Sequence, residues 1–165
     1  MRALPILGLL AGCTGKTTDS ATAADTGGPW APPDYAAMVE IDEGVWGSVV
    51  RLSGDWSTGD GDQNPLSVSV RVYPLLQDAD LERVSDRPGT TGLLKEPTAA
   101  AVAETTADAD GFYEIEVPAG PYTVLVQDLG DWYCGSYSET GVCPVTVLES
   151  DITQFDVRMS YDATY

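Results

Sequence analysis

Residues 105–126, TTADADGFYEIEVPAGPYTVLV, decide the fold class. They contain two runs in which apolar residues alternate with other residues, and turn-forming residues precede each run. This period-2 alternation predicts two strands that each place one face on a core and leave Glu114 and Glu116 in water. Gly111 and Gly120 are expected to supply backbone angles that other residues adopt only at a cost. The stretch therefore predicts the centre of a β-meander, with Tyr113, Ile115, Val117, Tyr122, Val124 and Val126 facing inward.

Further strands are predicted on both sides of this stretch. Residues 66–73 (LSVSVRVY) alternate most cleanly, and 38–52, 145–148 and 152–159 are also expected to contain strands. Between them, 53–65 is expected to be a turn-rich loop and 129–144 a loop that carries two cysteines. Residues 101–106 are predicted to form a hairpin through a turn at 108–111. The remaining predictions are an insertion at 75–100 with a short helix within 77–87, and a frayed tail at 160–165.

The composition limits the function. The chain has 165 residues, 43% of them hydrophobic, which suits one domain with a packed core. Its formal net charge of −18 argues against a nucleic-acid partner, because binding phosphates requires a basic surface. It contains no histidine, so Ser-His-Asp catalysis, Cys-His catalysis and His-ligated metals cannot occur.

The first residues predict an export signal. Arg2 is followed by an apolar run at residues 3–10, which is too short to span a bilayer and is typical of a signal peptide. The run ends in Leu10-Ala11-Gly12-Cys13, which resembles the lipobox of bacterial lipoproteins. The resemblance implies cleavage after residue 12 and a diacylglycerol on Cys13, and Thr14 favours the outer membrane or cell surface. The alternative is an ordinary secretory signal in which Cys13 has no role.

The chain is thus divided into three parts. Residues 1–12 are the expected lipoprotein signal peptide, and 13–35 form a tether that starts with the lipidated Cys13. The tether is predicted to be disordered because Thr, Ala, Gly, Asp and Pro leave almost nothing to bury. Residues 36–165 are the folded domain. About seven short strands separated by turns favour an all-β sandwich.

Four segments carry a resemblance to the carboxypeptidase regulatory-like domain: GVWGSV at 44–49, VSVRVY at 68–73, TADADGFY at 106–113 and VPAGPY at 117–122. The resemblance implies a Greek-key, transthyretin-like (prealbumin) sandwich related to collagen-adhesin B-type modules, with 75–100 departing from the pattern. It also implies a non-catalytic accessory, adhesive or spacing role. Some B-type relatives form a lysine–asparagine crosslink, but the first strand here has no lysine, so no such crosslink is expected.

Cys134 and Cys143 are the two cysteines that remain if Cys13 is acylated. Export places them in an oxidising compartment, which predicts a disulfide between them. A redox role is the alternative, but the spacing is not Cys-x-x-Cys and no cation lies nearby in the sequence.

Two loops carry candidate binding residues. The oxygen-rich loop at 53–65 is a weak candidate for Ca²⁺, although Pro65 stands where an EF-hand loop has glycine; a solvated turn is the alternative. Loop aromatics could stack on a sugar, or could instead cover the end of the sandwich. The calcium candidates are Asp55, Asp60, Asp62 and Asn64; the aromatic candidates are Trp56, Trp132, Tyr133 and Tyr137.

These observations predict a lipid-anchored module of the bacterial cell envelope that is not an enzyme and needs no cofactor. It would act as an interaction or spacer module, held to the membrane through Cys13 and contacting an envelope protein or a glycan. The alternative is a carbohydrate-binding module that uses the loop aromatics. A hydrolase would need a nucleophile and a base, and the sequence shows no such pair.

Overall fold

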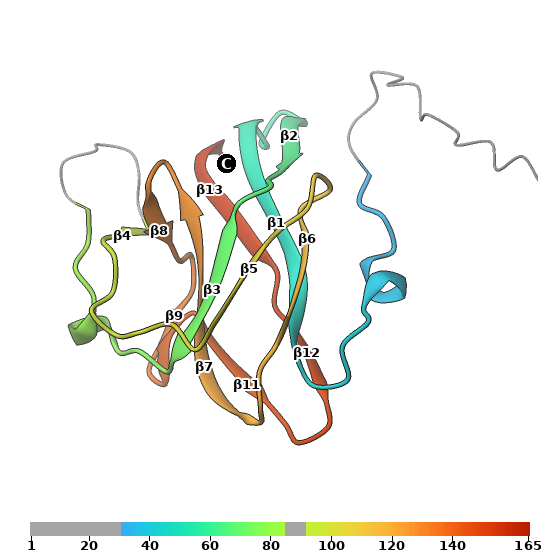
Figure 1. Ribbon diagram of the computed structural model, residues 1–165. Helices are drawn as coiled ribbons and strands as arrows, with labels where there is room; N and C mark the ends of the chain where they lie inside the picture. The colour runs from blue at the N-terminus through green and yellow to red at the C-terminus, as the bar shows by residue number, and fades with distance from the viewer. Residues whose placement is uncertain (1–30, 85–91) are drawn as a thin grey trace, which may run out of the picture.

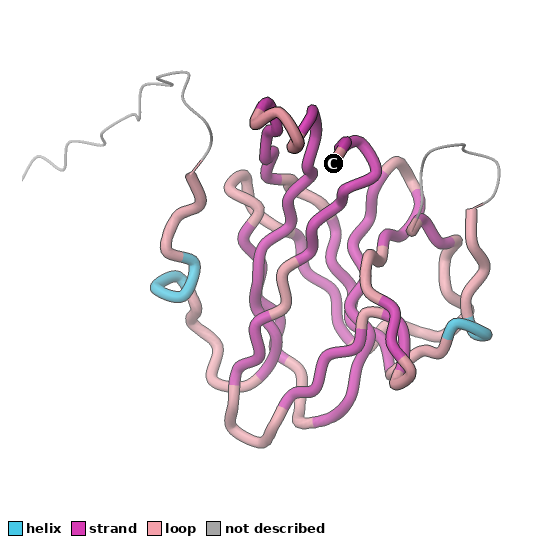
Figure 2. Tube along the Cα trace, turned by 180° about the vertical axis from the view of Figure 1, so that it is seen from behind, coloured by secondary structure: helices cyan, strands magenta, loops and turns pink. Residues whose placement is uncertain are grey.

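The computed structural model describes residues 31–84 and 92–165, and this part of the chain is almost entirely β (Figure 1). Two short 3₁₀ helices, η1 (Tyr35–Met38) and η2 (Asp78–Asp80), lie outside the sheets on opposite sides of the molecule (Figure 2). None of the helices in the described ranges is long and apolar enough to cross a membrane. The strands are β1 (Gly44–Asp55), β2 (Asp60–Pro65), β3 (Ser69–Pro74), β4 (Leu93–Leu94), β5 (Ala103–Thr106), β6 (Phe112–Glu116), β7 (Gly120–Asp128), β8 (Asp131–Tyr133), β9 (Tyr137–Ser138), β10 (Gly141–Val142), β11 (Pro144–Val147), β12 (Ile152–Gln154) and β13 (Val157–Thr164).

The first sheet is organised around β1. Strands β6 and β2 follow one another along one edge of β1 and are antiparallel to it. Val49 joins them, because its N–H donates to Gly111 O and its carbonyl accepts from Leu66 N. On the other edge, β12 and then β13 run parallel to β1, with Val49 paired to Val157. The last strand of the described chain therefore lies beside the first.

The second sheet has the order β4–β8–β7–β3–β5, and β11 pairs with the first part of β7. All of its pairs are antiparallel. The inner faces of the two sheets enclose the main core, which makes the molecule sandwich-like and supports the all-β prediction. That core includes Val45, Val49, Tyr113, Ile115, Val157 and Met159 from the first sheet, and Val70, Val72, Val124, Val126, Val145 and Val147 from the second.

The predicted meander at 105–126 is wrong in its pairing, although its inward-facing residues are confirmed. Strand β5 pairs with β3, β6 with β1, and β7 with β3, so the chain changes sheet twice within this stretch. The turn at 108–111 is a corner between the sheets and not a hairpin. Gly111 has a φ of +82°, as expected, but Gly120 has no positive φ. Alternation indicates which face of a strand is buried, and it does not indicate which strand lies beside it.

A second core lies on the outer face of the second sheet. Leu125, on the face of β7 opposite to the main core, is fully buried. Segments 75–84 and 92–101 and the disulfide loop cover it, so the predicted insertion is part of the packed fold. The predicted helix at 77–87 is only the three-residue η2 within the described residues. The second core contains Tyr73, Leu76, Leu94, Leu125, Trp132, Cys134, Val142 and Cys143.

Three predicted irregular segments contain strands. Most of 53–65 is a β-hairpin, because β1 continues to Asp55 and pairs with β2. The predicted tail is the second half of β13, which pairs with β1 as far as Thr164. Within 129–144 the structure has β8, β9 and β10. These strands are rich in Gly, Asp, Ser and Thr, so their sequences carry no apolar alternation.

The chain enters the domain along the outer face of the first sheet. Tyr35 stacks on Phe112 with ring centroids 5.8 Å apart, and its hydroxyl donates to Asp110 O over 2.6 Å. Together they cover Trp46. Tyr35 therefore belongs to the folded domain, whose predicted start at residue 36 is too late. The predicted signal peptide, Cys13 and the tether as far as residue 30 lie outside the described residues.

Close backbone approach explains a glycine in β1. A Cβ on Gly47 would lie 2.1 Å from the carbonyl oxygen of Phe155. That carbonyl accepts a hydrogen bond from the Tyr113 hydroxyl, which crosses the core from β6. Only glycine therefore allows β1 to lie this close to the backbone at Phe155.

Candidate functional site

The disulfide between Cys134 and Cys143 is confirmed, with its Cα atoms 5.9 Å apart. Both cysteines are buried in the second core. Thr123 of β7 fastens the same region, because its hydroxyl donates to Val142 O and accepts from Leu76 N. The bridge therefore secures the layer that covers the second sheet.

The candidate aromatic residues do not form a common surface. Trp132 is 1% exposed and Tyr133 is 4% exposed, so neither can stack on a sugar from solvent. This corrects the glycan-stacking role considered for them, because both side chains are committed to cores. Tyr137 is exposed under the guanidinium of Arg83, 4.5 Å from its ring centroid. Trp56 packs over Gly61 in the β1–β2 hairpin.

The four calcium candidates lie along the β1–β2 hairpin and do not converge. Asp60, Asp62 and Asn64 alternate along the exposed face of β2, which spaces them by roughly 7 Å at the usual strand rise. Asp55 pairs with Asp60 across the hairpin, but its Oδ1 accepts bonds from the Ser57 N–H and hydroxyl. Those bonds lower the pKa of Asp55. Within the described ranges no three His, Cys, Asp or Glu residues are grouped to hold a metal.

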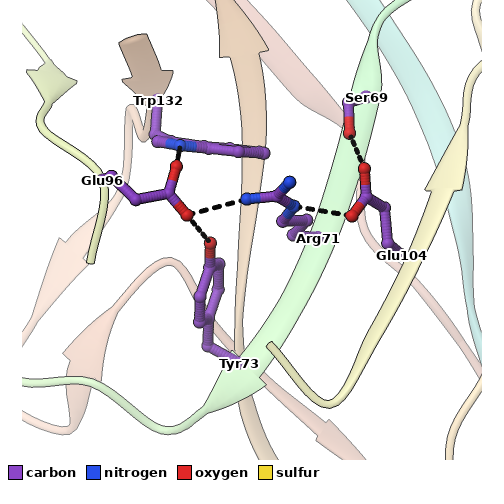
Figure 3. A network of polar contacts seen from close by, with 6 residues as sticks. All are labelled: Ser69, Arg71, Tyr73, Glu96, Glu104 and Trp132. Carbon is purple, nitrogen blue, oxygen red and sulfur yellow. Dashed lines mark hydrogen bonds and ion pairs between the residues drawn. The ribbon is translucent and has the colours of Figure 1, made fainter. Parts of the chain in front are cut away.

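A polar network on the outer face of the second sheet was not predicted (Figure 3). Arg71 of β3 lies between two carboxylates, with Nη1 at 2.7 Å from Glu96 and Nε at 2.8 Å from Glu104. Its guanidinium also stacks over Trp132, 4.5 Å from the ring centroid. The indole N–H of Trp132 donates to the second oxygen of Glu96. This network fastens segment 92–101 to the sheet.

The network has clear electrostatic consequences. The hydrogen bond from Arg71 lowers the pKa of Glu104, and the Ser69 hydroxyl, which donates to Glu104 Oε1 over 2.8 Å, lowers it further. The bond to Glu104 raises the pKa of Arg71, which stays charged. Burial raises the pKa of the Tyr73 hydroxyl, which donates weakly to Glu96 at 3.4 Å. These shifts in pKa favour the charged forms of Arg71 and Glu104 and the neutral form of Tyr73.

A second polar cluster fills the end of the main core near the β7–β8 turn. Asp128 is buried and accepts from the Arg51 guanidinium and from the Tyr161 hydroxyl. Burial raises the pKa of Asp128, and Arg51 acts in the opposite direction. Arg51 also lies 3.8 Å from Asp162 of β13. This cluster links β1, β7 and β13, and the buried Nε of Arg51 has no hydrogen-bond partner in it.

Two hollows flank the junction of β12 and β13. One, of about 210 Å³, is lined by the disulfide loop and by Phe155, Val157 and Arg158. The other, also about 210 Å³, lies on the outer face of the first sheet under Pro32, Pro33 and Tyr35. Asp156 and Arg158 line both hollows.

Sequence reasoning missed both arginine networks and these hollows. Arg71 lies in the alternating run at 66–73, but Glu96 is 25 residues away in a segment without periodicity. Asp128, Tyr161 and Arg158 carried no local signal, because their partners come from strands distant in the sequence. Comparison of the chain with protein-family models, with curated proteins and with solved structures found no match.

Proposed function

We propose that this protein is a non-catalytic, lipid-anchored interaction or spacer module of the bacterial cell envelope. Acylated Cys13 would hold it to the membrane, and the β-domain would be presented at the outer membrane or cell surface. The finer fold within this proposal is the Greek-key, transthyretin-like sandwich. The two crossings between sheets within 105–126 support that topology.

The observation that carries the proposal is the way the chain from the expected anchor joins the domain. Tyr35 is fixed on the outer face of the first sheet by its ring stacking and its hydrogen bond to Asp110 O. A second contact, from Glu40 N to Glu114 Oε2 over 2.8 Å, continues this attachment. The chain that precedes the domain is thus fixed on the outer face of the first sheet from Tyr35 to Glu40, which supports presentation of the domain from an anchor at its amino end.

The polar chemistry also supports a non-catalytic role. In the two arginine networks described above, Glu96, Glu104 and Asp128 each bind an arginine and a hydroxyl or indole donor. The hydroxyls of Ser48 and Ser69 donate to carboxylates, but neither lies in a triad, since the chain has no histidine. Ion pairs of this kind hold segments in place.

Metabolic labelling with a fatty acid tests the anchor. The wild-type chain is expected to incorporate label and to fractionate with the membrane, and Cys13→Ala is expected to lose both properties. Cys134→Ala with Cys143→Ala is the matched control, because it removes thiols that the proposal does not acylate. Label retained by Cys13→Ala, or absent from the wild type, would refute the lipid anchor.

A further inference from the structure

A hollow of about 210 Å³ lies between the chain that enters the domain and the outer face of the first sheet. Pro32, Pro33 and Tyr35 form a largely apolar wall, and Val50, which is 3% exposed, adds a further apolar contact. The remaining lining residues are polar and come from β1, β2, β12 and the start of β13: Ser48, Gln63, Gln154, Asp156 and Arg158. The hollow thus offers an apolar wall and two opposite charges to the same occupant.

Asp156 and Arg158 lie on the same face of the sheet. Val157 between them is buried in the main core, and successive side chains of a strand point to opposite faces. Arg158 is the register partner of Val50, which also lines the hollow. Asp156 binds the side chain of Ser48 on the neighbouring strand. Both charged side chains are therefore on the outer face, with their Cα atoms separated by roughly 7 Å at the usual strand rise.

Asp156 is held in place by neutral groups and keeps its negative charge. Its Oδ1 accepts from the N–H and the hydroxyl of Ser48 at 2.9 and 2.8 Å. Its Oδ2 accepts from Gln154 Nε2 at 2.9 Å. A carboxylate has about four acceptor positions, so one of them remains for a further donor. Asp156 is therefore an oriented acceptor that still attracts a cation.

Arg158 supplies the opposite charge. The other described cations each form an ion pair with a carboxylate: Arg51, Arg71, Arg83 and Lys95. Within residues 31–84 and 92–165 the guanidinium of Arg158 forms none, although Asp156 lines the same hollow. Its planar group offers parallel N–H donors whose geometry suits a carboxylate. The two charges of the hollow are thus each available to a ligand.

The surroundings of the hollow disfavour a ligand with a single charge. Burial, together with the carboxylates of Asp110, Asp108 and Asp156, raises the pKa of Tyr35 from 10.0 to about 12. A plain anion that approached Arg158 would therefore meet negative charges beside the Tyr35 wall. A plain cation would be repelled by the guanidinium and would leave it without a carboxylate. A ligand that carries both charges avoids both costs.

We infer that this hollow binds a free α-amino acid, in which an ammonium group and a carboxylate lie on one carbon atom. The ammonium group donates to the remaining acceptor position of Asp156, and the carboxylate binds the guanidinium of Arg158. An apolar side chain of the ligand lies against Val50 and the proline wall, where its burial adds to the affinity. The inference adds a small-molecule ligand to the proposed interaction module and is independent of the lipid anchor.

Nuclear magnetic resonance titration of the ¹⁵N-labelled full chain carrying Cys13→Ala tests the inference. Three probes are used: L-leucine, leucine amide, which keeps only the ammonium group, and acetyl-leucine, which keeps only the carboxylate. L-leucine is expected to shift the amide signals of Val50 and Arg158. It should bind more tightly than either single-charge probe by about tenfold or more, as the loss of one charge-assisted hydrogen bond predicts. Equal binding of either single-charge probe, or shifts confined to another surface, would overturn the inference.

Variants assign the two charges. Arg158→Gln and Asp156→Asn are each expected to weaken L-leucine by about tenfold or more. Arg83→Gln is the matched control, because Arg83 is a surface cation already paired with Asp78, and its binding curve should equal that of the parent. The amide spectrum shows whether each variant is folded, and Arg158→Gln at its exposed position decides the matter if Asp156→Asn is not. Unchanged binding by a folded variant at either position would refute the site. Fatty-acid labelling is unaffected by these results, so the two proposals fail separately.

Discussion

The guanidinium of Arg71 stacks over the indole of Trp132, while the indole N–H and the guanidinium bind the two oxygens of the same Glu96 carboxylate. The three side chains come from β3, from β8 and from the segment that follows β4. A buried aromatic ring thus supports an ion pair whose Glu96 side chain is 61% exposed to water. The arrangement depends on a flat guanidinium, because an ammonium group cannot stack and bridge two carboxylates in this way.

Arg71→Lys is therefore expected to reduce the free energy of unfolding by about 1–2 kcal/mol, since it loses the stacking and one carboxylate contact. Urea denaturation measures this. Arg83→Lys is a matched control: Arg83 lies at the same 4.5 Å from the Tyr137 ring but is 51% exposed, so a loss under about 0.5 kcal/mol is expected. Equal losses in both variants would show that the buried indole adds nothing.

Removing the disulfide is expected to destabilise the domain. In the loop-entropy model, closing ten residues stabilises by about 2.7 kcal/mol, so Cys134→Ala with Cys143→Ala should lower the free energy of unfolding by a similar amount. Adding a reductant to the wild type under partly unfolding conditions should move its urea midpoint towards that of the variant. The variant itself should not respond to reductant. An unchanged midpoint in the variant would contradict the structural role of the bridge.

Tyr35 should make the domain sensitive to alkali. Burial, with help from Asp110, raises its pKa from 10.0 to about 12. The folded protein therefore keeps this proton where the unfolded chain has lost it, so Tyr35 contributes stability below pH 10 that is lost as the pH rises towards 12. Tyr35→Phe removes this contribution, and its urea midpoint should fall less steeply over that interval. Parallel falls in both proteins would assign the alkaline loss to other tyrosines.

The β7–β8 turn offers a stabilising substitution. Leu129 and Gly130 form a two-residue turn with φ values of +52° and +86°, and the Leu129 side chain is 53% exposed. A type I′ turn favours asparagine at the first position, so Leu129→Asn should stabilise the domain by about 0.5–1 kcal/mol, given the cost of left-handed backbone for other residues. Leu129→Val should destabilise it, because branching at Cβ crowds this conformation. Thermal unfolding distinguishes the two directions.

The fold class and most inward-facing residues could be predicted from the sequence, because a strand that is buried on one face has an apolar residue at every second position. Tyr113, Val124 and Val126 were all assigned correctly on that basis. The identity of a strand's neighbour in the sheet produces no such local pattern, so the pairing of β5 with β3 and of β6 with β1 was not predicted. Strand β2 was missed for a different reason, since an exposed edge strand of polar residues has no core face to repeat.

Among the candidate sites, the disulfide could be predicted because only Cys134 and Cys143 remain once Cys13 is assigned to acylation in the lipobox. For Trp132 and Tyr133 the sequence left packing against the sandwich and sugar stacking as alternatives, and their burial follows from segment 92–101 crossing the outer face of the second sheet. Leu93 and Leu94 are both buried, but two apolar residues between Gly92 and Lys95 are too short a signal to indicate a strand. The arginine networks depend on the same long-range placement.

The parallel pairing of β1 with β13 determines when this domain can form during synthesis. Val49 and Val157 are neighbours in the first sheet although 107 residues separate them in the chain. Closing so long a loop brings a large entropic cost before any contact compensates for it. A chain emerging from its amino end can assemble much of the second sheet early, but β1 keeps an open edge until β13 has emerged. Folding of the domain is therefore completed late, when β13 has emerged and can pair with β1.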